Sequence, residues 1–509
     1  MAESNRKSRL AIVEETTEGT LVLPTSASQY IALQDGFSLV PNFELVDNAE
    51  LKSSIGVSAP IQGSENPTVE LSHYMRHSHV EGTAPNFGQL LEAAFGETVA
   101  FSGSQRATTA ASTAGTSSAA AVIKLAAGGT DYERGKAVLI KDGTNNYSIR
   151  PVKSVATNDL TLGFNLAAAP ASGISVGKPV FYKPNDVPPS LSYVLYRANG
   201  ADVEAVAGAK ISEFSMDATA GEALNSSFSA EGIKYFFNPV EITASTKYLD
   251  FLDNATTRVA TLTVKVYRDQ YELAQAVQDA MNSLGSANTF TVTYNPSGAS
   301  AGKYTIASNG ATLTLKWNTG TNTANSIASK LGFSTAADSS AALTYDSTTV
   351  ASYASPQTPS LDAGQPLLVK NMEVMIGDFA DYGCSGAQSF SFSMANEVVR
   401  VPDICSESGF SGTVNNKRTV TCDAVLTLTK HDSEKFKNFR AGDTVSFSFN
   451  FGTKSGGNWE AGKCGNLYMP DCKITAYEVS DNDGIVVINL TVQAFVDTNG
   501  YGEVYLTFL

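Results

Sequence analysis

The sequence predicts a mainly β protein that contains the same β-sandwich or barrel domain twice, each copy with one short helix, together with a small inserted β module and an α+β module. The duplication is indicated first by two similar stretches. Residues 210–221 align without a gap on residues 473–484, so that Lys210 falls on Lys473, a shift of 263 (473 − 210). Each stretch alternates in polarity and runs into a turn rich in Gly, Asp and Asn, which predicts a β-hairpin.

A second pair of similar stretches lies upstream. Residues 95–101 resemble residues 441–447, and each follows a short helical pattern that stops at a glycine, Gly96 or Gly442. This shift is 346 (442 − 96), which exceeds the first by 83 residues (346 − 263). The first copy is therefore expected to hold an insertion between its helix and its hairpin. Two matches in the same order favour duplication over a chance match.

These patterns divide the chain into an arm, two β domains and two modules. The expected boundaries are 1–35 for the N-terminal arm, 36–112 and 188–240 for the discontinuous first β domain, 113–187 for the inserted β module, 241–358 for the α+β module and 359–509 for the second β domain. The arm shows little periodicity. At 509 residues the chain is too long for a single core.

The first copy begins with strands expected at 37–46 and 68–74, joined by a long Gly/Ser/Pro loop. A helix at 86–95 follows, and then a run of Ala, Ser and Thr typical of a linker. The inserted module reads as short strands between 122 and 182. The α+β module combines a helix at 269–284, which has one apolar face, with strands and a second helix near 323–331.

The second copy is expected to contain strands at 368–376, 389–394 and 419–429, with a loop at 403–417 and a helix at 432–439. The last strands fall at 444–451, 473–479, 485–494 and 503–509. The alternation in 485–494 is out of phase by one residue with the matching strand of the first copy. Either a bulge in one copy or an imperfect repeat would account for this difference.

Composition limits the function classes. Charged residues make up 17% of the chain and the net charge is −15, the wrong sign for a protein that gains affinity by neutralising phosphates. No apolar run approaches the roughly 18–20 residues that span a bilayer, so we expect no membrane insertion. The five cysteines are expected as buried, reduced thiols, and a bridge between Cys464 and Cys472 is left open.

Catalytic and metal-binding patterns are weak. His73, His77 and His79 form one cluster, but packing or hydrogen bonding suits them better than a zinc site. The glycine-rich stretch at 129–137 has the wrong spacing for a phosphate loop. No nucleophile elbow occurs near a paired His and Asp. We therefore expect no enzyme, no cofactor and no metal.

The opening residues 10–20 (LAIVEETTEGT) resemble the start of the major tail tube proteins of long-tailed, non-contractile bacteriophages. The two-sheet pattern with one short helix is similar to the core fold of that family, and the module around 248–251 and 331–335 looks like a domain of phage structural proteins. The resemblance implies a virion protein of the phage tail, assembled in the host cytoplasm. Its implied partners are further copies of itself, the tape measure, terminator and baseplate proteins, and DNA in transit.

In that family, tube subunits form stacked six-fold rings whose inner sheets join into a barrel around the DNA channel. The resemblance therefore implies that a chain with two such domains forms a homotrimeric, pseudo-hexameric ring. An acidic or neutral lumen would not hold phosphates. The candidate lumen residues are Glu213, Asp217, Asn489, Thr491 and Gln493, and the candidate inter-ring loop residues are Ser53, Glu65, Asp403, Glu407 and Lys417.

Three alternatives remain open from the sequence. A surface adhesin or carbohydrate-binding β protein would bind glycan as a monomer. Another tail component, such as the terminator or a baseplate protein, would share the fold without building the tube. A glycan-degrading tailspike would show a solenoid repeat, which the sequence lacks.

Overall fold

The computed structural model describes residues 5–50, 55–101, 103–109, 119–198, 200, 202–353, 356–362, 364–377, 386–428, 433–496 and 502–509. Strands hold 50% of the residues and helices 9%, which confirms the mainly β class predicted from the sequence.

Seventeen strands form one connected sheet system. Those before the α+β module are β1 (Arg9–Glu14), β2 (Tyr30–Ile31), β3 (Ser38–Val40), β6 (Thr68–Tyr74), β7 (Gly96–Val99), β14 (Val180–Pro184), β15 (Leu191–Arg197), β16 (Asp202–Thr219), β17 (Asn225–Glu231) and β18 (Lys234–Phe237). Those after it are β28 (Glu373–Ile376), β29 (Ala387–Pro402), β30 (Phe410–Thr427), β31 (Val445–Ser455), β32 (Asn458–Asn482), β33 (Ile485–Ala494) and β34 (Tyr505–Phe508).

Eight of these strands form a continuous antiparallel run that crosses from the first copy into the second. Their order is β3-β6-β17-β16-β29-β30-β33-β32, and this run is named the long sheet below. Four strands come from each of the two segments that the sequence predicted as copies, and these segments are called the first and second copy below. One hydrophobic core, which takes residues from Leu10 to Phe508, lies behind it. The two predicted copies therefore share one sheet and one core.

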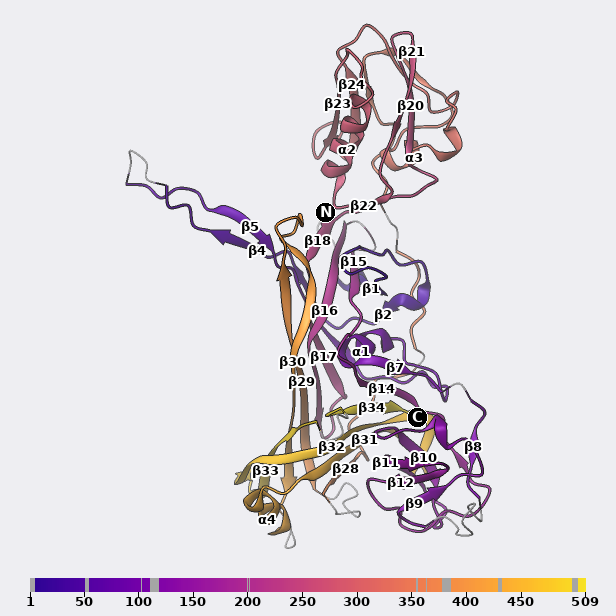
Figure 1. Cartoon of the computed structure of the whole chain (residues 1–509), viewed down its shortest axis with the longest axis vertical. Helices are drawn as coiled ribbons and strands as arrows, with labels where there is room; N and C mark the ends of the chain where they lie inside the picture. Colours follow the sequence, from indigo (N-terminus) through magenta and orange to yellow (C-terminus); the bar gives the residue numbers. More distant parts are fainter. Residues whose placement is uncertain are drawn as a thin grey trace.

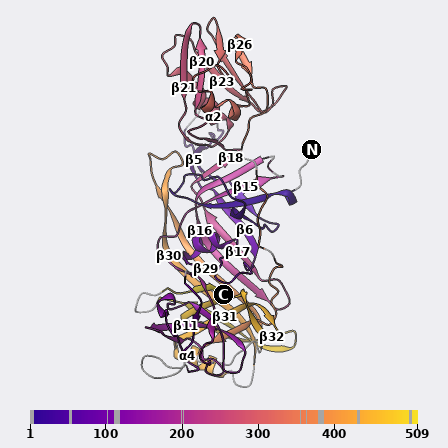
Figure 2. The same cartoon turned by 90° about the vertical axis from the view of Figure 1, so that its right-hand side faces the viewer.

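Figure 1 shows an elongated molecule with β16, β17, β29 and β30 along its length. The α+β module lies at one end and the inserted β module at the other, and Figure 2 shows the same order after a quarter turn. A hairpin of β4 (Phe43–Val46) and β5 (Ile61–Glu65) projects sideways from the body.

Each copy carries one short helix that ends at a glycine with positive φ. Helix α1 (Gly88–Phe95) is followed by Gly96 at φ 117°, and α4 (Ser433–Ala441) by Gly442 at φ 68°. A left-handed residue after the last helical turn is the usual place for glycine. Helix α1 packs on β16 and α4 packs on β32, which are the corresponding strands of the two copies.

The two hairpins that suggested the duplication also share an irregularity. The β16–β17 register shifts at Ser212 and the β32–β33 register at Thr475, and these positions differ by 263 (475 − 212). A bulge in only one copy is therefore wrong as the cause of the phase difference. Instead, seven residues (218–224) connect the paired residues Asp217 and Asn225, whereas six residues (481–486) connect the corresponding pair in the second copy.

The segment expected as an N-terminal arm contains part of the core. Strand β1 is buried and pairs with β15, because Leu10 to Val13 form an apolar run that can be covered on both faces. Behind it, the carboxylate of Glu15 accepts hydrogen bonds from Ser190, Ser192 and the backbone N–H of Gly208. Burial raises the pKa of Glu15.

The loop expected at 403–417 is shorter in the structure. Strand β30 begins at Phe410, so that Lys417 lies in a strand, paired with Glu397, and the connection spans only residues 403–409. In this half of the β29–β30 hairpin, the more buried positions carry polar side chains such as Arg400 and Thr413, whereas Val399, Val401 and Val414 are exposed. The sequence therefore shows no apolar face from which the strands could be recognised.

The inserted module is a six-stranded sheet with its own small core. Its strands are β8 (Arg106–Ala107), β9 (Val122–Lys124), β10 (Ala137–Lys141), β11 (Tyr147–Ala156), β12 (Asp159–Leu162) and β13 (Ser175–Val176). It begins earlier than the expected residue 113. The strand expected to close it, β14, pairs instead with β7 and β34 of the main sheet system.

The α+β module has a separate core between Val240 and Ala351. Its elements are β19 (Val240–Ile242), β20 (Tyr248–Asp253), β21 (Thr256–Thr261), β22 (Lys265–Tyr267), α2 (Gln270–Asn282), β23 (Phe290–Asn295), β24 (Lys303–Ser308), β25 (Leu313–Leu315), α3 (Ala328–Leu331), β26 (Ser339–Ala342) and β27 (Thr344–Asp346). Asp269 caps α2 by accepting from the backbone N–H groups of Tyr271 and Glu272.

Candidate functional site: the polar face and edges of the long sheet

One face of the long sheet is covered by small polar side chains. Because side chains alternate along a strand, the face opposite the core presents every second residue. One row across seven neighbouring strands runs through Ser72, Ser227, Ser215, Ser393, Thr421, Gln493 and Lys473. Hydroxyl groups thus dominate the row, with contributions from both copies.

The structure brings all five candidate lumen residues to this face. Glu213 and Asp217 lie on β16, and Asn489, Thr491 and Gln493 lie on β33, three strands along the same sheet. The registers connect them, since Gln493 lies opposite Thr421 and the row continues to β16.

Side chains on neighbouring strands of this face form hydrogen bonds with one another. Ser393 Oγ donates to Glu213 Oε1 at 3.0 Å, and Ser391 Oγ donates to Asp217 Oδ1 at 2.6 Å. In the second copy, Thr491 Oγ1 donates to Asp423 Oδ1 at 2.6 Å. Short side chains that bond to their neighbours leave a flat surface with few long, mobile groups.

The charge on this face is mainly negative. Its exposed carboxylates include Glu70, Glu213, Asp217 and Asp423, and Lys473 adds an exposed cation at its β32 end. A surface of this composition lacks the clustered Lys and Arg that release counterions from a nucleic acid. It can therefore lie beside a polyanion without binding it.

The candidate inter-ring residues that the structure describes lie on the β4–β5 and β29–β30 hairpins. Glu65, at the end of β5, is 4% exposed, and Arg268 Nη1 lies 2.8 Å from its Oε2. Arg268 Nη2 also lies 3.5 Å from Glu407 at the tip of the β29–β30 hairpin. Asp403 accepts a hydrogen bond from the N–H of Cys405 within the tip. Ser53 lies outside the described residues.

Arg268 thus ties both hairpins to the α+β module. The carboxylate of Glu65 forms an ion pair with Arg268 of the same chain, whereas the sequence predicted a loop residue that contacts the next ring. The hairpin arms expose apolar side chains instead: Leu45 65%, Ile55 109%, Val57 97% and Ile404 103%. Exposed apolar groups on projecting arms are typical of contact surfaces. The sequence could have indicated them by the Ile and Val residues inside an otherwise polar loop.

The two copies meet at an internal junction between β16 and β29. Phe214 packs on Phe392, with ring centroids 5.8 Å apart, and both side chains are fully buried. Asn396 Nδ2 donates to the carbonyls of Ile211 and Ala94, each at 3.1 Å. The carbonyl of Ala94 in the last turn of α1 is thereby satisfied by a residue of the second copy.

The first and last strands of the long sheet, β3 and β32, form its two edges. Among the described residues, β3 pairs only with β6, and the part of β32 from Ala476 to Asn482 pairs only with β33. Apolar side chains are exposed at both edges: Val40 (38%) on β3 and Val479 (50%) on β32. Next to the β32 edge, Phe436 of α4 (46%) and Ile485 and Val486 of β33 (49% and 48%) are also exposed. An open strand edge is a template for pairing with another chain.

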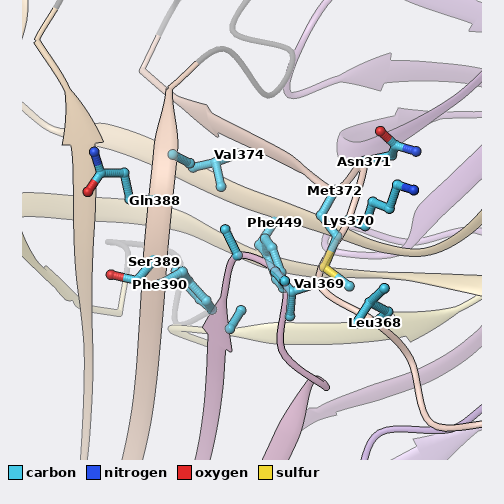
Figure 3. A pocket seen from close by; sticks show the side chains of 14 residues that line it. Leu368, Val369, Lys370, Asn371, Met372, Val374, Gln388, Ser389, Phe390 and Phe449 are labelled. Atoms are coloured by element: carbon cyan, nitrogen blue, oxygen red, sulfur yellow. The ribbon is translucent and has the colours of Figure 1, made fainter.

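A hollow of about 400 Å³ lies at the end of the internal junction (Figure 3). The apolar side chains of Val369, Met372 and Phe449 gather in it, beside residues of β16 and β29. Among the described residues that line it, the polar side chains are those of Lys370, Asn371, Gln388 and Ser389. None of these lining residues is a carboxylate, histidine or cysteine that could activate the Lys370 amine or the Ser389 hydroxyl.

The histidine cluster is divided between core and surface. His73 and His77 are 2% and 3% exposed and pack on Phe87 and Phe451, whereas His79 is exposed. Burial lowers the pKa of His77 to about 3, and burial with the charge of Arg76 lowers the pKa of His73 to about 4. Within the described ranges, no three His, Cys, Asp or Glu residues are grouped to hold a metal ion.

The cysteines that the structure describes are free thiols, and Cys422, Cys464 and Cys472 are buried. Cys384 lies outside the described residues. Over the described parts of the chain, no helix has both the length and the apolar character needed to cross a membrane.

No family model matches this chain, and no curated protein matches its sequence.

Proposed function

We propose that this chain is the structural subunit of a phage-type tail tube, in which three copies join their long sheets edge to edge into a ring and the rings stack into a conduit for DNA. The observation that carries the proposal is the long sheet itself. It has one core face, one polar face and two open edges at opposite ends. Head-to-tail pairing of the two edges closes a ring and leaves no edge within it.

The dimensions suit a conduit. Three copies of eight strands would give 24 strands, and at about 4.8 Å between strands and a tilt of about 40° the barrel would be roughly 50 Å across between backbones. A duplex passes through such a bore. The polar, mainly acidic face would line it, which favours passage over retention of a polyanion.

The exposed apolar hairpin arms suit contacts between rings. A contact between unlike surfaces on successive rings does not close on itself, and it therefore yields a filament of open length. The other tail proteins named by the resemblance would meet the ends of such a filament.

Electron microscopy of the purified protein in negative stain, with light scattering, tests the proposal. Hollow tubes, or rings with threefold symmetry and a mass of three chains, are expected. Isolated rings that never stack would favour a terminator-like component. Monodisperse monomers at high concentration would overturn the proposal, and glycan binding by such monomers would favour the adhesin alternative.

A further inference from the structure

The internal junction between β16 and β29 allows the contact between neighbouring copies to be worked out residue by residue. This inference rests on the proposed function and adds the strand register of the interface. It uses the correspondence between the two copies, which the registers of the long sheet define on each side of the junction.

The first correspondence concerns the inner strands. Three residues lie side by side on β16, β17 and β6, and three others lie side by side on β32, β33 and β30. The rows are Met216, Ser226 and His73, and Val479, Ile488 and Leu426. Since Met216 corresponds to Val479 through the shift of 263, His73 corresponds to Leu426, a shift of 353 (426 − 73).

The second correspondence concerns the outer strands. Ser38 on β3 lies opposite Glu70 on β6, and Ser391 on β29 lies opposite Asp423 on β30. Both pairs differ by 353 (391 − 38 and 423 − 70). Strand β3 is therefore the counterpart of β29, and Ser38 is the counterpart of Ser391.

At the internal junction, Asp217 lies opposite Ser391 and Ser215 lies opposite Ser393. Asp217 corresponds to Ser480 (217 + 263), and Ser391 corresponds to Ser38. We infer that β32 of one copy pairs antiparallel with β3 of a second copy of this chain, with Ser480 opposite Ser38 and Glu478 opposite Val40.

Exposure supports this pairing independently. Met216 and Phe392 are fully buried at the internal junction. Their counterparts at the open edges are Val479, which is 50% exposed, and Leu39, which already faces the core at 5% exposure. The inferred register places Val479 beside Leu39, on the apolar side of the sheet. Val479 then loses its exposure to water as Met216 does within one chain.

Disulfide trapping tests the register in the full chain. The background carries Cys405→Ser and Cys384→Ser, which removes the exposed thiol and the thiol outside the described residues. Two double variants place cysteines in register, Ser38→Cys with Ser480→Cys and Val40→Cys with Glu478→Cys. Two matched controls exchange the partners, Ser38→Cys with Glu478→Cys and Val40→Cys with Ser480→Cys.

Directly opposed residues have Cα atoms about 4.5–5.5 Å apart, within disulfide range, whereas the exchanged pairs are displaced by two residues. Under mild oxidation, the in-register variants should form covalent trimers about tenfold faster than the controls. Equal or faster trapping of the exchanged pairs would overturn the register.

Microscopy of the same samples separates the two proposals. Rings that form without trapping of either in-register pair would overturn the register and leave the proposed function standing. Chains that stay monomeric in the unsubstituted background would overturn both.

Discussion

Met216 and Val479 occupy corresponding positions in two hairpins that share a bulge, yet Met216 is fully buried and Val479 is half exposed. The strands themselves are alike. The difference is the neighbour, because β29 pairs with β16 along this edge, whereas the corresponding edge of β32 pairs with no other strand of the described residues. The internal junction therefore serves as a template for an interface between chains, and substitutions at matched positions test this comparison.

The largest contrast is expected from an added charge. Met216→Glu would bury a carboxylate without a partner and should lower the free energy of unfolding by about 3–5 kcal/mol or prevent folding. Val479→Glu should cost the single chain about 1 kcal/mol or less, since its side chain stays half exposed, but it should abolish ring formation. Urea denaturation and light scattering measure the two effects. Rings of normal yield from Val479→Glu would contradict the comparison.

The glycines that end the two short helices give the next contrast. At Gly96, an added Cβ would lie 2.7–2.8 Å from atoms of Asn185, whereas at Gly442 it would meet nothing within 4 Å. Both have positive φ, so each alanine costs about 1–2 kcal/mol, and the clash should bring Gly96→Ala to about 3 kcal/mol or more. Thermal unfolding of both variants measures the difference. Equal losses would show that the surroundings of α1 and α4 do not differ in packing.

The third comparison concerns the response of stability to acid, at position 73 of the first copy and the corresponding position 426 of the second. His73 is buried where the second copy has Leu426, and its folded pKa of about 4 lies below the usual 6.5. The unfolded chain therefore takes up the proton first, and stability should fall as pH drops from 6.5 toward 4. The loss from this group is about 2 kcal/mol at pH 5.

His73→Leu should remove that part of the acid sensitivity, while the contribution of His77 remains. Urea midpoints measured from pH 7.5 to pH 5 give the slope. An unchanged slope in His73→Leu would show that His73 is not the group responsible.

The smallest effect on stability is expected on the polar face. Lysine at Ser227, Ser215 or Ser393, which lie in one partly exposed row, should change the unfolding free energy by about 0.5 kcal/mol or less for each single substitution. In the assembled ring the three lysines together should create duplex DNA binding that weakens steeply with salt. The matched control places three lysines at Thr256, Thr257 and Thr291 of the α+β module. Filter binding at several salt concentrations compares them, and equal affinity in both variants would contradict a polar face that lines the bore.

The sequence predicted those elements in which one face is buried. Residues 213–219 of β16 and residues 488–494 of β33 alternate between buried and more exposed positions. This alternation brings Glu213, Asp217, Asn489, Thr491 and Gln493 to a common face. Strand β1 was missed because both of its faces are covered. The distal part of the β29–β30 hairpin was missed because polar residues such as Thr413 occupy its more buried positions and valines its exposed ones.

The pairing of β16 with β29 was beyond the sequence, since the two strands are separated by the whole α+β module. Glu65 was taken for a free loop residue for the same reason. Its partner Arg268 lies 203 residues away, and nothing local to either residue indicates the contact.

During synthesis, β16 and β29 can pair only after the long segment between them has been made. Strand β16 ends at Thr219 and β29 begins at Ala387, so 168 residues (387 − 219) must leave the ribosome before β16 gains its neighbour. At about 5–20 residues per second, that takes on the order of 10–30 s. During this interval the nascent chain carries an open strand edge that suits another nascent chain as well as its own continuation. The tether favours the intramolecular partner through its high effective concentration.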